Sequence, residues 1–303
     1  MDVVAAPPER SGRAAREGGG TWADYGRLMR PRIVGMVLLT MLATAVLAAG
    51  PHVPWVRLAH ALAGSTLVIV GAIALNQRLE MRRDARMSRT AARPLPQGRL
   101  SPTIVSRLAA GATALGLIYL ALAVNGATTL LAAASWLIYV WVYTPLKPLS
   151  VWQTPVGAVA GAMPTLLGAG AVDGLHDPLA WTLFGVLYLW QIPHSMAIAW
   201  MYRGDFAAAE VRLATIVEPS GRAAGAAALL AAVCLIPVSL VPVACCDAGL
   251  AYAVIVSLLG SVYAVVAWAF LLRRDDLRAS RLLRVSLVYL PLLLAELLVA
   301  RLG

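Results

Sequence analysis

Long uncharged apolar runs recur from residue 31 to the end of this 303-residue chain, and they constrain its fold more than any other feature. Each run has about 18 to 22 residues, enough to cross a hydrocarbon core of about 30 Å as a helix. The composition agrees, because 60% of the residues are hydrophobic and only 13% are charged. Since the runs are continuous, they predict an all-helical membrane protein and not a transmembrane β-barrel.

We predict nine spans, at residues 31–49, 57–76, 104–123, 126–143, 155–172, 179–200, 224–243, 249–271 and 285–302. This arrangement puts 23 of the 25 Lys and Arg residues on one side of the membrane. Because positive residues accumulate in cytoplasmic segments, the N-terminus is predicted to be cytoplasmic and the C-terminus outside. These residues lie in short loops without interleaved aromatic side chains, so the net charge of +10 does not indicate nucleic-acid binding.

Small residues such as Gly157 and Gly161, and prolines in or near the spans, favour a bundle that encloses an apolar chamber.

The first 20 residues are predicted to form a disordered cytoplasmic arm, followed by one domain over residues 21–303. The arm has no apolar segment, which argues against a secretory signal, and its acidic residues argue against an organellar transit peptide. Cys234, Cys245 and Cys246 form no CxxC motif, so we interpret them as small core residues.

One strongly charged segment, NQRLEMRRDARMSRTAARPLPQGR, extends from Asn76 to Arg99 between two apolar runs. Asn76, Glu80 and Asp84 are spaced four apart, so on a helix each is turned by about 40° and displaced by about 6 Å from the previous one. One face then carries an amide and two carboxylates, surrounded by arginines. Mg²⁺ is commonly bound by one or two carboxylates together with substrate phosphates, so this stripe suits a phosphorylated ligand. The alternative is a solvated loop whose arginines only set the topology.

The predicted topology brings further polar segments to the same side of the membrane. The sixth span ends in WQIPHSMAIAWMYRGDF, the fourth is followed by YTPLKPLS, and the first begins after RPR. Acids that hold a metal ion, surrounded by cations that neutralise phosphate oxygens, are what a Mg²⁺–diphosphate site requires. For His194, which follows a proline in the sixth span, a structural and a functional role stay open. The acids and histidine of the outer loops recur at no fixed spacing, and we interpret them as solvated turn residues: Asp173, His176, Asp177 and Asp247.

These segments resemble the motifs of the UbiA-type intramembrane prenyltransferases, and in particular the branch that farnesylates protohaem. The pattern DxxMxRTxxRPLPxG extends from Asp84 to Gly98, and WQxPH ends at His194. Further similar stretches are RPRIVGMVLLT, YTPLKPLSVWQTPVGAVAGAMPTLLG and SLVYLPLLL, so the resemblance covers nearly the whole chain after the arm. It implies a Mg²⁺-dependent bundle that transfers the farnesyl group of farnesyl diphosphate to a vinyl group of protohaem IX, with addition of water, giving haem O.

The resemblance also implies roles for particular residues. Asn76, Glu80 and Asp84 would form the first metal–diphosphate site, and Asp205 would anchor the second, with Glu80, Asp84 and Asp205 as metal ligands. The diphosphate would be bound by Arg32, Arg89, Arg93, Lys147 and Arg203. Tyr143 and Tyr202 would shield or orient the allylic end, and His194 would contact the haem iron or a propionate. By analogy the chain would lie in the cell inner membrane, with a terminal oxidase or a haem O hydroxylase as downstream partner.

The chain departs from the family pattern at three positions, where many relatives have an acid in place of Arg82, a tyrosine in place of Phe206 and a glycine in place of Glu210.

Two alternative functions remain. The chain could be a member of the same family that prenylates another acceptor, either a quinone precursor or a chlorophyll-type macrocycle. The shape of the pocket would decide which acceptor is used. A transporter would carry ionisable groups or broken helices near the bilayer midplane, whereas the acids here gather at one membrane face.

Overall fold

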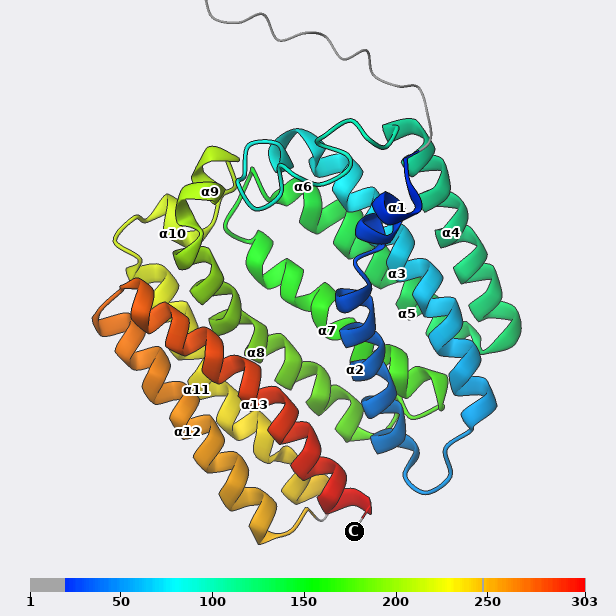
Figure 1. The fold of residues 1–303 in the computed structure, drawn as a ribbon. Helices are drawn as coiled ribbons and strands as arrows, with labels where there is room; N and C mark the ends of the chain where they lie inside the picture. The colour runs from blue at the N-terminus through cyan, green and yellow to red at the C-terminus, as the bar shows by residue number, and fades with distance from the viewer. Residues whose placement is uncertain (1–19, 247, 303) are drawn as a thin grey trace, which may run out of the picture.

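The computed structural model describes residues 20–246 and 248–302, and every regular element in these ranges is a helix (Figure 1). The elements are α1 (Trp22–Met29), α2 (Pro31–Ala49), α3 (Trp55–Asp84), α4 (Pro102–Ala123), α5 (Gly126–Leu137), the π-helix η1 (Ile138–Tyr143), α6 (Thr144–Leu146), α7 (Gln153–Ala171), α8 (Pro178–Met201), α9 (Arg203–Ala208), α10 (Ala214–Val217), α11 (Arg222–Cys245), α12 (Leu250–Leu272) and α13 (Asp276–Leu302). The predicted all-helical class is confirmed. The predicted arm lies outside the described residues except for Gly20, and so does Asp247.

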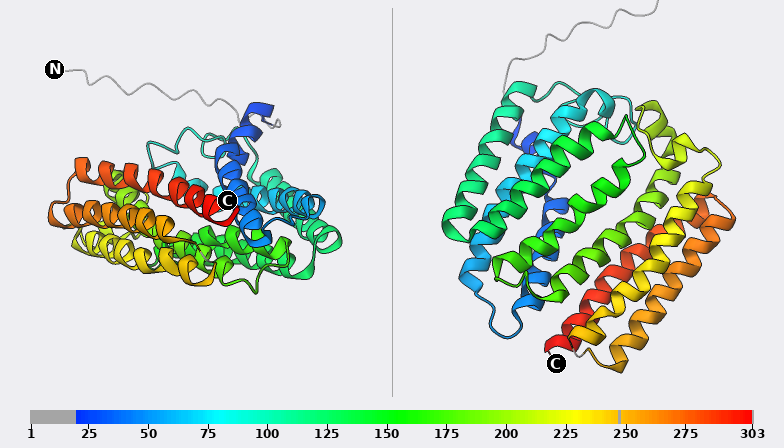
Figure 2. Two further views of the ribbon diagram at one scale, coloured as in Figure 1. Left: turned by 90° about the horizontal axis from the view of Figure 1, so that it is seen from below. Right: turned by 180° about the vertical axis from the view of Figure 1, so that it is seen from behind.

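The long helices lie side by side, and the short ones gather at one end of the bundle (Figures 1 and 2). At that end, uppermost in Figure 1, lie α1, α6, α9, α10 and the loop between α3 and α4. The turn between α2 and α3 and the end of α13 lie at the opposite end. The charged segments that the sequence places on one side of the membrane therefore share one end of the fold, which we call the polar end.

Seven helical segments of the described residues are long and apolar enough to cross a membrane, namely Pro31–Ala49, Trp55–Asp84, Pro102–Ala123, Gly126–Leu146, Arg222–Cys245, Leu250–Leu272 and Asp276–Arg301. The predicted spans at 155–172 and 179–200 form α7 and α8, which are not among them, so the prediction of nine spans is not confirmed. The reason is that both helices lie inside the bundle. All residues from 162 to 171 of α7 are buried by other helices, so this helix can carry glycine and proline where a lipid-facing one needs larger apolar side chains.

Two groups of helices pack around separate apolar cores. One core lies among α8, α11, α12 and α13 and contains the fully buried Tyr263, Phe270 and Tyr289. The other lies among α2, α3, α4, α5 and α7. Within the second group α3 and α4 touch backbone to backbone, because a Cβ at Gly116 would lie 2.8 Å from the carbonyl oxygen of Gly64. The two groups join where α7 packs against α8.

Candidate active site

A cavity of about 500 Å³ lies among α2, α3, α5, η1, α7 and α8. Near the polar end its wall is charged and polar, with Arg30, Asn76, Glu80, Arg83, Asp84, Arg89, Arg93, Lys147 and Gln153. Deeper in the bundle the wall is mainly apolar, with Ile33, Val37, Val68, Ile69, Ala72, Ile73, Ala132, Trp136 and Leu167. The cavity therefore has one end suited to an anion and one suited to a hydrocarbon chain.

The predicted stripe of Asn76, Glu80 and Asp84 forms on α3, because this helix continues without interruption to Asp84. All three side chains line the cavity and are nearly buried, with exposures of 4%, 8% and 1%. A solvated loop would leave these carboxylates exposed. The structure therefore favours the site over the loop for this segment.

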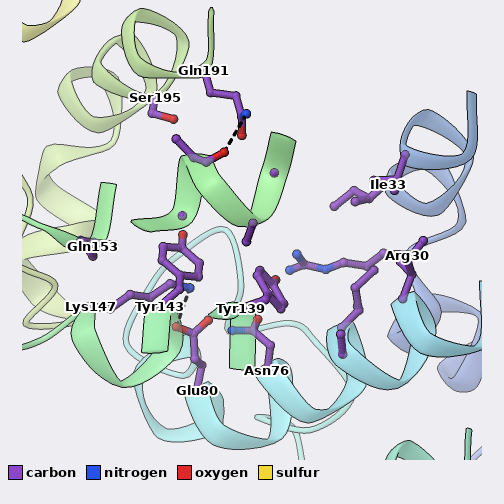
Figure 3. A pocket seen from close by; sticks show the side chains of 18 of the residues that line it. Arg30, Ile33, Asn76, Glu80, Tyr139, Tyr143, Lys147, Gln153, Gln191 and Ser195 are labelled. Atoms are coloured by element: carbon purple, nitrogen blue, oxygen red, sulfur yellow. Dashed lines mark hydrogen bonds and ion pairs between the residues drawn. The ribbon is translucent and has the colours of Figure 1, made fainter. Parts of the chain in front are cut away.

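Each carboxylate of the stripe pairs with a cation from another segment. Lys147 Nζ lies 2.6 Å from Glu80 Oε1 (Figure 3). Arg93 Nη1 lies 2.5 Å from Asp84 Oδ2. Asn76 donates a hydrogen bond of 2.8 Å to the hydroxyl of Thr144, the first residue of α6. Charges buried in this way persist only when paired. The contacts of Lys147 and Thr144 therefore hold α3 against α6.

The loop after α3 is folded so that Arg93 faces Asp84. The Thr90 hydroxyl donates to the Asp84 carbonyl oxygen at 2.8 Å, and Met87 and Leu95 are buried beneath the loop. Farther along, Arg99 Nε lies 2.9 Å from Asp24 Oδ1 of α1. These contacts fix both ends of a segment that would otherwise be mobile.

Asp205 on α9 contacts this loop and does not line the cavity. Its carboxylate accepts hydrogen bonds from the Ser88 hydroxyl at 2.9 Å and from the Ser88 backbone amide at 3.3 Å. The hydrogen bond from the Ser88 hydroxyl holds the pKa of Asp205 below its usual value. The neighbouring Arg89 lies over the ring of Phe206, with its guanidinium carbon 4.7 Å from the ring centre. Asp84 and Asp205 thus lie at the same end of the fold, joined through the loop that carries Ser88.

Seven of the predicted site residues line the cavity: Asn76, Glu80, Asp84, Arg89, Arg93, Tyr143 and Lys147. Five do not: Arg32, His194, Tyr202, Arg203 and Asp205. Arg32 is exposed on α2, and Arg203 pairs with Asp276 at 2.8 Å. Tyr202 is exposed at the end of α8, with Arg89 over its ring at 5.4 Å.

His194 faces α13, away from the cavity wall. Its Nδ1 lies 2.8 Å from the Ser286 hydroxyl, and its ring stacks on Trp190 with the ring centres 5.0 Å apart. Trp190 in turn donates to the Ser286 carbonyl oxygen at 2.7 Å. In this arrangement the histidine joins α8 to α13, so the structural role left open above is the one that these contacts support.

The polar cavity residues absent from the predicted site include Arg30, Gln191 and Ser195. Arg30 precedes α2 in a left-handed backbone conformation with φ 50°, and its side chain reaches the cavity, whereas Arg32 two residues later does not. Gln191 and Ser195 line the cavity from α8. The available signal for Gln191 was its place in the WQxPH motif.

The three departures from the family pattern have separate structural settings. Arg82 is exposed and lies outside the cavity wall, so the missing acid does not alter the stripe. Phe206 lines the cavity beneath Arg89. Glu210 has a φ of 56°, a region that favours glycine, and its carboxylate pairs with Arg86 at 2.8 Å on the surface. Glu210 is therefore placed as a solvated ion-pair partner and not in the cavity.

Gly157 and Gly161, the two glycines of the GxxxG motif, leave space for side chains of the cavity wall in addition to allowing close helix packing. A Cβ at Gly157 would lie 2.7 Å from the ring of Tyr143, and a Cβ at Gly161 would collide with the carboxamide oxygen of Gln191. These glycines therefore make room for two side chains of the cavity wall.

The donor set at the polar end fits a hard divalent cation in part. The described residues contain no group of three His, Cys, Asp or Glu side chains close enough to share a metal. Glu80 and Asp84 nevertheless lie in one cavity with the amide of Asn76, and Mg²⁺ takes few protein ligands when phosphate oxygens complete its shell. Two carboxylates, an amide and nearby cations are compatible with a Mg²⁺–diphosphate group.

A helical membrane bundle with an apolar chamber and a charged end defines an intramembrane site for a lipid-like anion. The chain belongs to the UbiA prenyltransferase family, whose model matches residues 37–289. It is therefore a multi-pass membrane prenyltransferase. Among curated relatives, the protoheme IX farnesyltransferase of Solibacter usitatus is 37% identical over 292 residues, covering 92% of this chain and 99% of that protein. The protoheme IX farnesyltransferase of Rhodopirellula baltica is 40% identical over 276 residues, covering 88% and 96%.

Solved structures share the fold at low sequence identity. A structure described for digeranylgeranylglyceryl phosphate synthase has a TM-score of 0.78 at 15% identity and covers 92% of this chain and 98% of that one. An apo UbiA homologue from Aeropyrum pernix has a TM-score of 0.68 at 19% identity, covering 90% and 98%. A UbiA homologue from Archaeoglobus fulgidus, bound to GPP and Mg²⁺, has a TM-score of 0.60 at 15% identity, covering 91% and 99%.

Proposed function

We propose that this chain transfers the farnesyl group of farnesyl diphosphate to a vinyl group of protohaem IX, with addition of water, and releases haem O and diphosphate. The observation that carries this proposal is the buried stripe of Asn76, Glu80 and Asp84, which meets Lys147 and Arg93 in one cavity with an apolar interior. The relatives from Solibacter and Rhodopirellula support protohaem as the acceptor, because each matches this chain over nearly its whole length.

The polar end of the cavity would bind the diphosphate. Mg²⁺, when bound there by Glu80, Asp84 and the Asn76 amide, would neutralise diphosphate charge and so make it a better leaving group. Lys147 and Arg93, which neutralise these carboxylates in the structure, are within reach of the same cavity and would contact phosphate oxygens. Arg30 and Arg89 add positive charge to the wall. We keep Asp205 as a proposed second acid, reached through movement of the Ser88 loop, and Arg32 and Arg203 as proposed outer diphosphate contacts.

The farnesyl chain would lie in the apolar interior, with its first carbon near the diphosphate end. The rings of Tyr139 and Tyr143 are stacked with centres 5.6 Å apart, and the Lys147 ammonium lies 4.6 Å from the Tyr143 ring centre. A ring face that accepts a cation here is also suited to stabilise positive charge on the allylic carbon. The surrounding helices exclude bulk water, which would otherwise trap that carbon as farnesol. Tyr202 and His194, which lie outside the cavity wall, remain proposed contacts to the prenyl chain or haem.

We place the polar end on the cytoplasmic side of the cell inner membrane, because Lys and Arg are concentrated there. The N-terminus would then be cytoplasmic and the C-terminus outside. The added farnesyl chain makes the product more lipophilic than protohaem, so we propose another membrane protein as its consumer, by analogy a haem O hydroxylase or a terminal oxidase.

The test is to incubate membranes that contain the protein with protohaem, farnesyl diphosphate and Mg²⁺, and to identify haem O by mass. We expect Asp84→Asn to lower turnover by about 100-fold or more and to raise the Mg²⁺ concentration needed for half-maximal rate, since one carboxylate ligand is lost. Asp177→Asn is the matched control, because Asp177 caps α8 at the opposite end and asparagine caps equally well. Prenylation of a quinone precursor without any haem O would contradict the assigned acceptor. Unchanged turnover of Asp84→Asn at limiting Mg²⁺ would contradict the metal site.

A further inference from the structure

Two polar side chains on α8 line the cavity wall one helical turn apart. Gln191 and Ser195 both belong to this wall, and Figure 3 shows them across the cavity from Asn76 and Glu80 on α3. Because positions four apart lie on the same face of a helix, their polar groups are neighbours. Neither residue belongs to the cluster of acids and cations that would hold the diphosphate.

The carboxamide of Gln191 is held in one orientation. Its nitrogen donates to the Leu187 carbonyl oxygen at 2.8 Å and to the Ala158 carbonyl oxygen at 3.3 Å. Both of these hydrogen bonds use the nitrogen, so the oxygen is the group left to accept another hydrogen bond. That oxygen lies over Gly161, where any side chain would displace it. The contacts thus present a fixed acceptor at the cavity wall.

An acceptor and a neighbouring hydroxyl match the requirements of one ordered water molecule. A water in a protein interior needs at least two polar partners, and the Gln191 oxygen and the Ser195 hydroxyl supply them. A farnesyl chain has no polar group to offer at this position. The hydrogen bond to Ala158 uses only the nitrogen of Gln191, so it does not explain why Gly161 leaves space for the carboxamide oxygen.

We propose that Gln191, assisted by Ser195, positions the water molecule that becomes the hydroxyl group of the product. This inference rests on the proposed function. The vinyl group attacks the first carbon of the farnesyl chain, so a carbon–carbon bond forms as the bond to diphosphate breaks. Positive charge then lies on the inner vinyl carbon, next to the macrocycle. The water oxygen bonds to that carbon and loses one proton. The base for this proton is the diphosphate that the reaction itself releases, which takes the proton up as it leaves through the cavity.

The placement of this water separates two competing reactions. A water beside the diphosphate would attack the allylic carbon early and release farnesol. Gln191 and Ser195 lie across the cavity from Glu80 (Figure 3). A water held by them would therefore meet the cation only after the new carbon–carbon bond has formed. Without a positioned water, the same cation loses a proton from the adjacent carbon and gives an alkene lighter by one water. The ratio of the two products therefore reports on water positioning.

The experiment compares Gln191→Leu and Ser195→Ala with the wild-type protein, using protohaem, farnesyl diphosphate and oxygen-labelled water. We expect each variant to farnesylate haem, with the ratio of hydroxylated to dehydrated product lowered by about fivefold, the effect of one hydrogen bond on a rate. Ser135→Ala is the matched control, since Ser135 lines the same cavity from α5. This control is expected to keep the wild-type product ratio.

Three outcomes would overturn the proposal. One is an unchanged product ratio in both variants, and another is a ratio that falls equally in Ser135→Ala. The third is a proportional loss of both products without a change in their ratio, which would place these residues before bond formation or in folding alone. If Gln191→Leu does not fold, Ser195→Ala decides the question by the same ratio. A wild-type protein that farnesylates no haem would refute the proposed function instead, and it is recognised by the absence of either product.

Discussion

The Asp205 carboxylate accepts a hydrogen bond of 2.9 Å from the hydroxyl of Ser88, a residue 117 positions earlier in the chain. This contact joins α9 to the loop that carries Arg89 and Arg93, and it brings the two predicted acidic motifs to one end of the bundle. In this position Asp205 does not line the cavity wall. Release of Asp205 from Ser88 is therefore the movement that a second acidic ligand would require.

The Ser88 contact predicts a pH dependence for the docking of α9. Because the pKa of Asp205 is lowered by Ser88, its ionised form stabilises the docked state. This contribution is complete above the ordinary aspartate pKa of about 3.9 and is lost as the pH falls through the lower folded value. Ser88→Ala removes the main cause of the shift, so α9 should detach at a higher pH than in the wild-type protein. Hydrogen exchange of residues 203–211 as a function of pH measures this.

The control for this experiment is Ser106→Ala, because Ser106 donates only to the Pro102 carbonyl oxygen of its own helix. This variant should leave exchange in residues 203–211 as it is in the wild-type protein. If Ser88→Ala gives the same pH profile as the control, the hydrogen bond does not hold α9.

Arg30 and Arg32 form a matched pair for testing the diphosphate site. The sequence resemblance indicates Arg32, whereas only Arg30 lines the cavity. Arg30→Gln removes a guanidinium beside the acids and should raise KM for farnesyl diphosphate by about tenfold, the loss of one charge-assisted hydrogen bond. Arg32→Gln should have the smaller effect, because this side chain is exposed outside the wall. Steady-state kinetics at saturating protohaem compare them, and a larger effect at Arg32 would restore the prediction from sequence.

Glu80 and Lys147 are predicted to be energetically coupled. Their charged atoms lie 2.6 Å apart, and the two side chains are only 10% and 15% exposed. Lys147→Met leaves a buried carboxylate without its partner and should destabilise the protein by about 3–5 kcal/mol. The double variant Glu80→Gln with Lys147→Met should be more stable than Lys147→Met alone. Thermal unfolding in one detergent measures the cycle, and simple additivity of the two changes would show that the pair is not coupled.

Local periodicity was sufficient to predict that the acidic stripe lies on one face of a helix. Asn76, Glu80 and Asp84 lie on one helix, so their spacing alone determines that they share a face. Lys147 was predicted at the same end because the topology alternates between membrane sides. Its contact with Glu80 depends on how η1 and α6 pack against α3, which the sequence does not specify.

The cavity wall differs from the predicted site where tertiary contacts choose between neighbouring positions. In α8, Trp190 and His194 face α13, whereas Gln191 and Ser195, about 100° farther round the helix, face the cavity. Two residues that are adjacent in the sequence of α8 can therefore have different roles, one in a contact between helices and the other in the cavity wall. Arg30 lines the cavity and Arg32 does not for a similar reason, because the left-handed conformation of Arg30 redirects the chain before α2. The predicted spans at α7 and α8 are a further case. Both helices are long enough to cross a membrane, but they are less apolar than the other long helices because they lie inside the bundle.

Glu210 gives a prediction that separates structural strain from ligand binding. Its φ of 56° disfavours a side chain, so Glu210→Gly should stabilise the protein by about 1 kcal/mol. The exposed pair with Arg86 offsets little of this gain, because such ion pairs contribute about 0–1 kcal/mol. Glu210→Ala removes the same carboxylate but keeps the strained backbone, so it should not raise the melting temperature. Both variants should keep wild-type turnover, since the Glu210 carboxylate lies outside the cavity wall. A loss of turnover in both, with the fold intact, would instead identify this carboxylate as a ligand that reaches the site during the reaction.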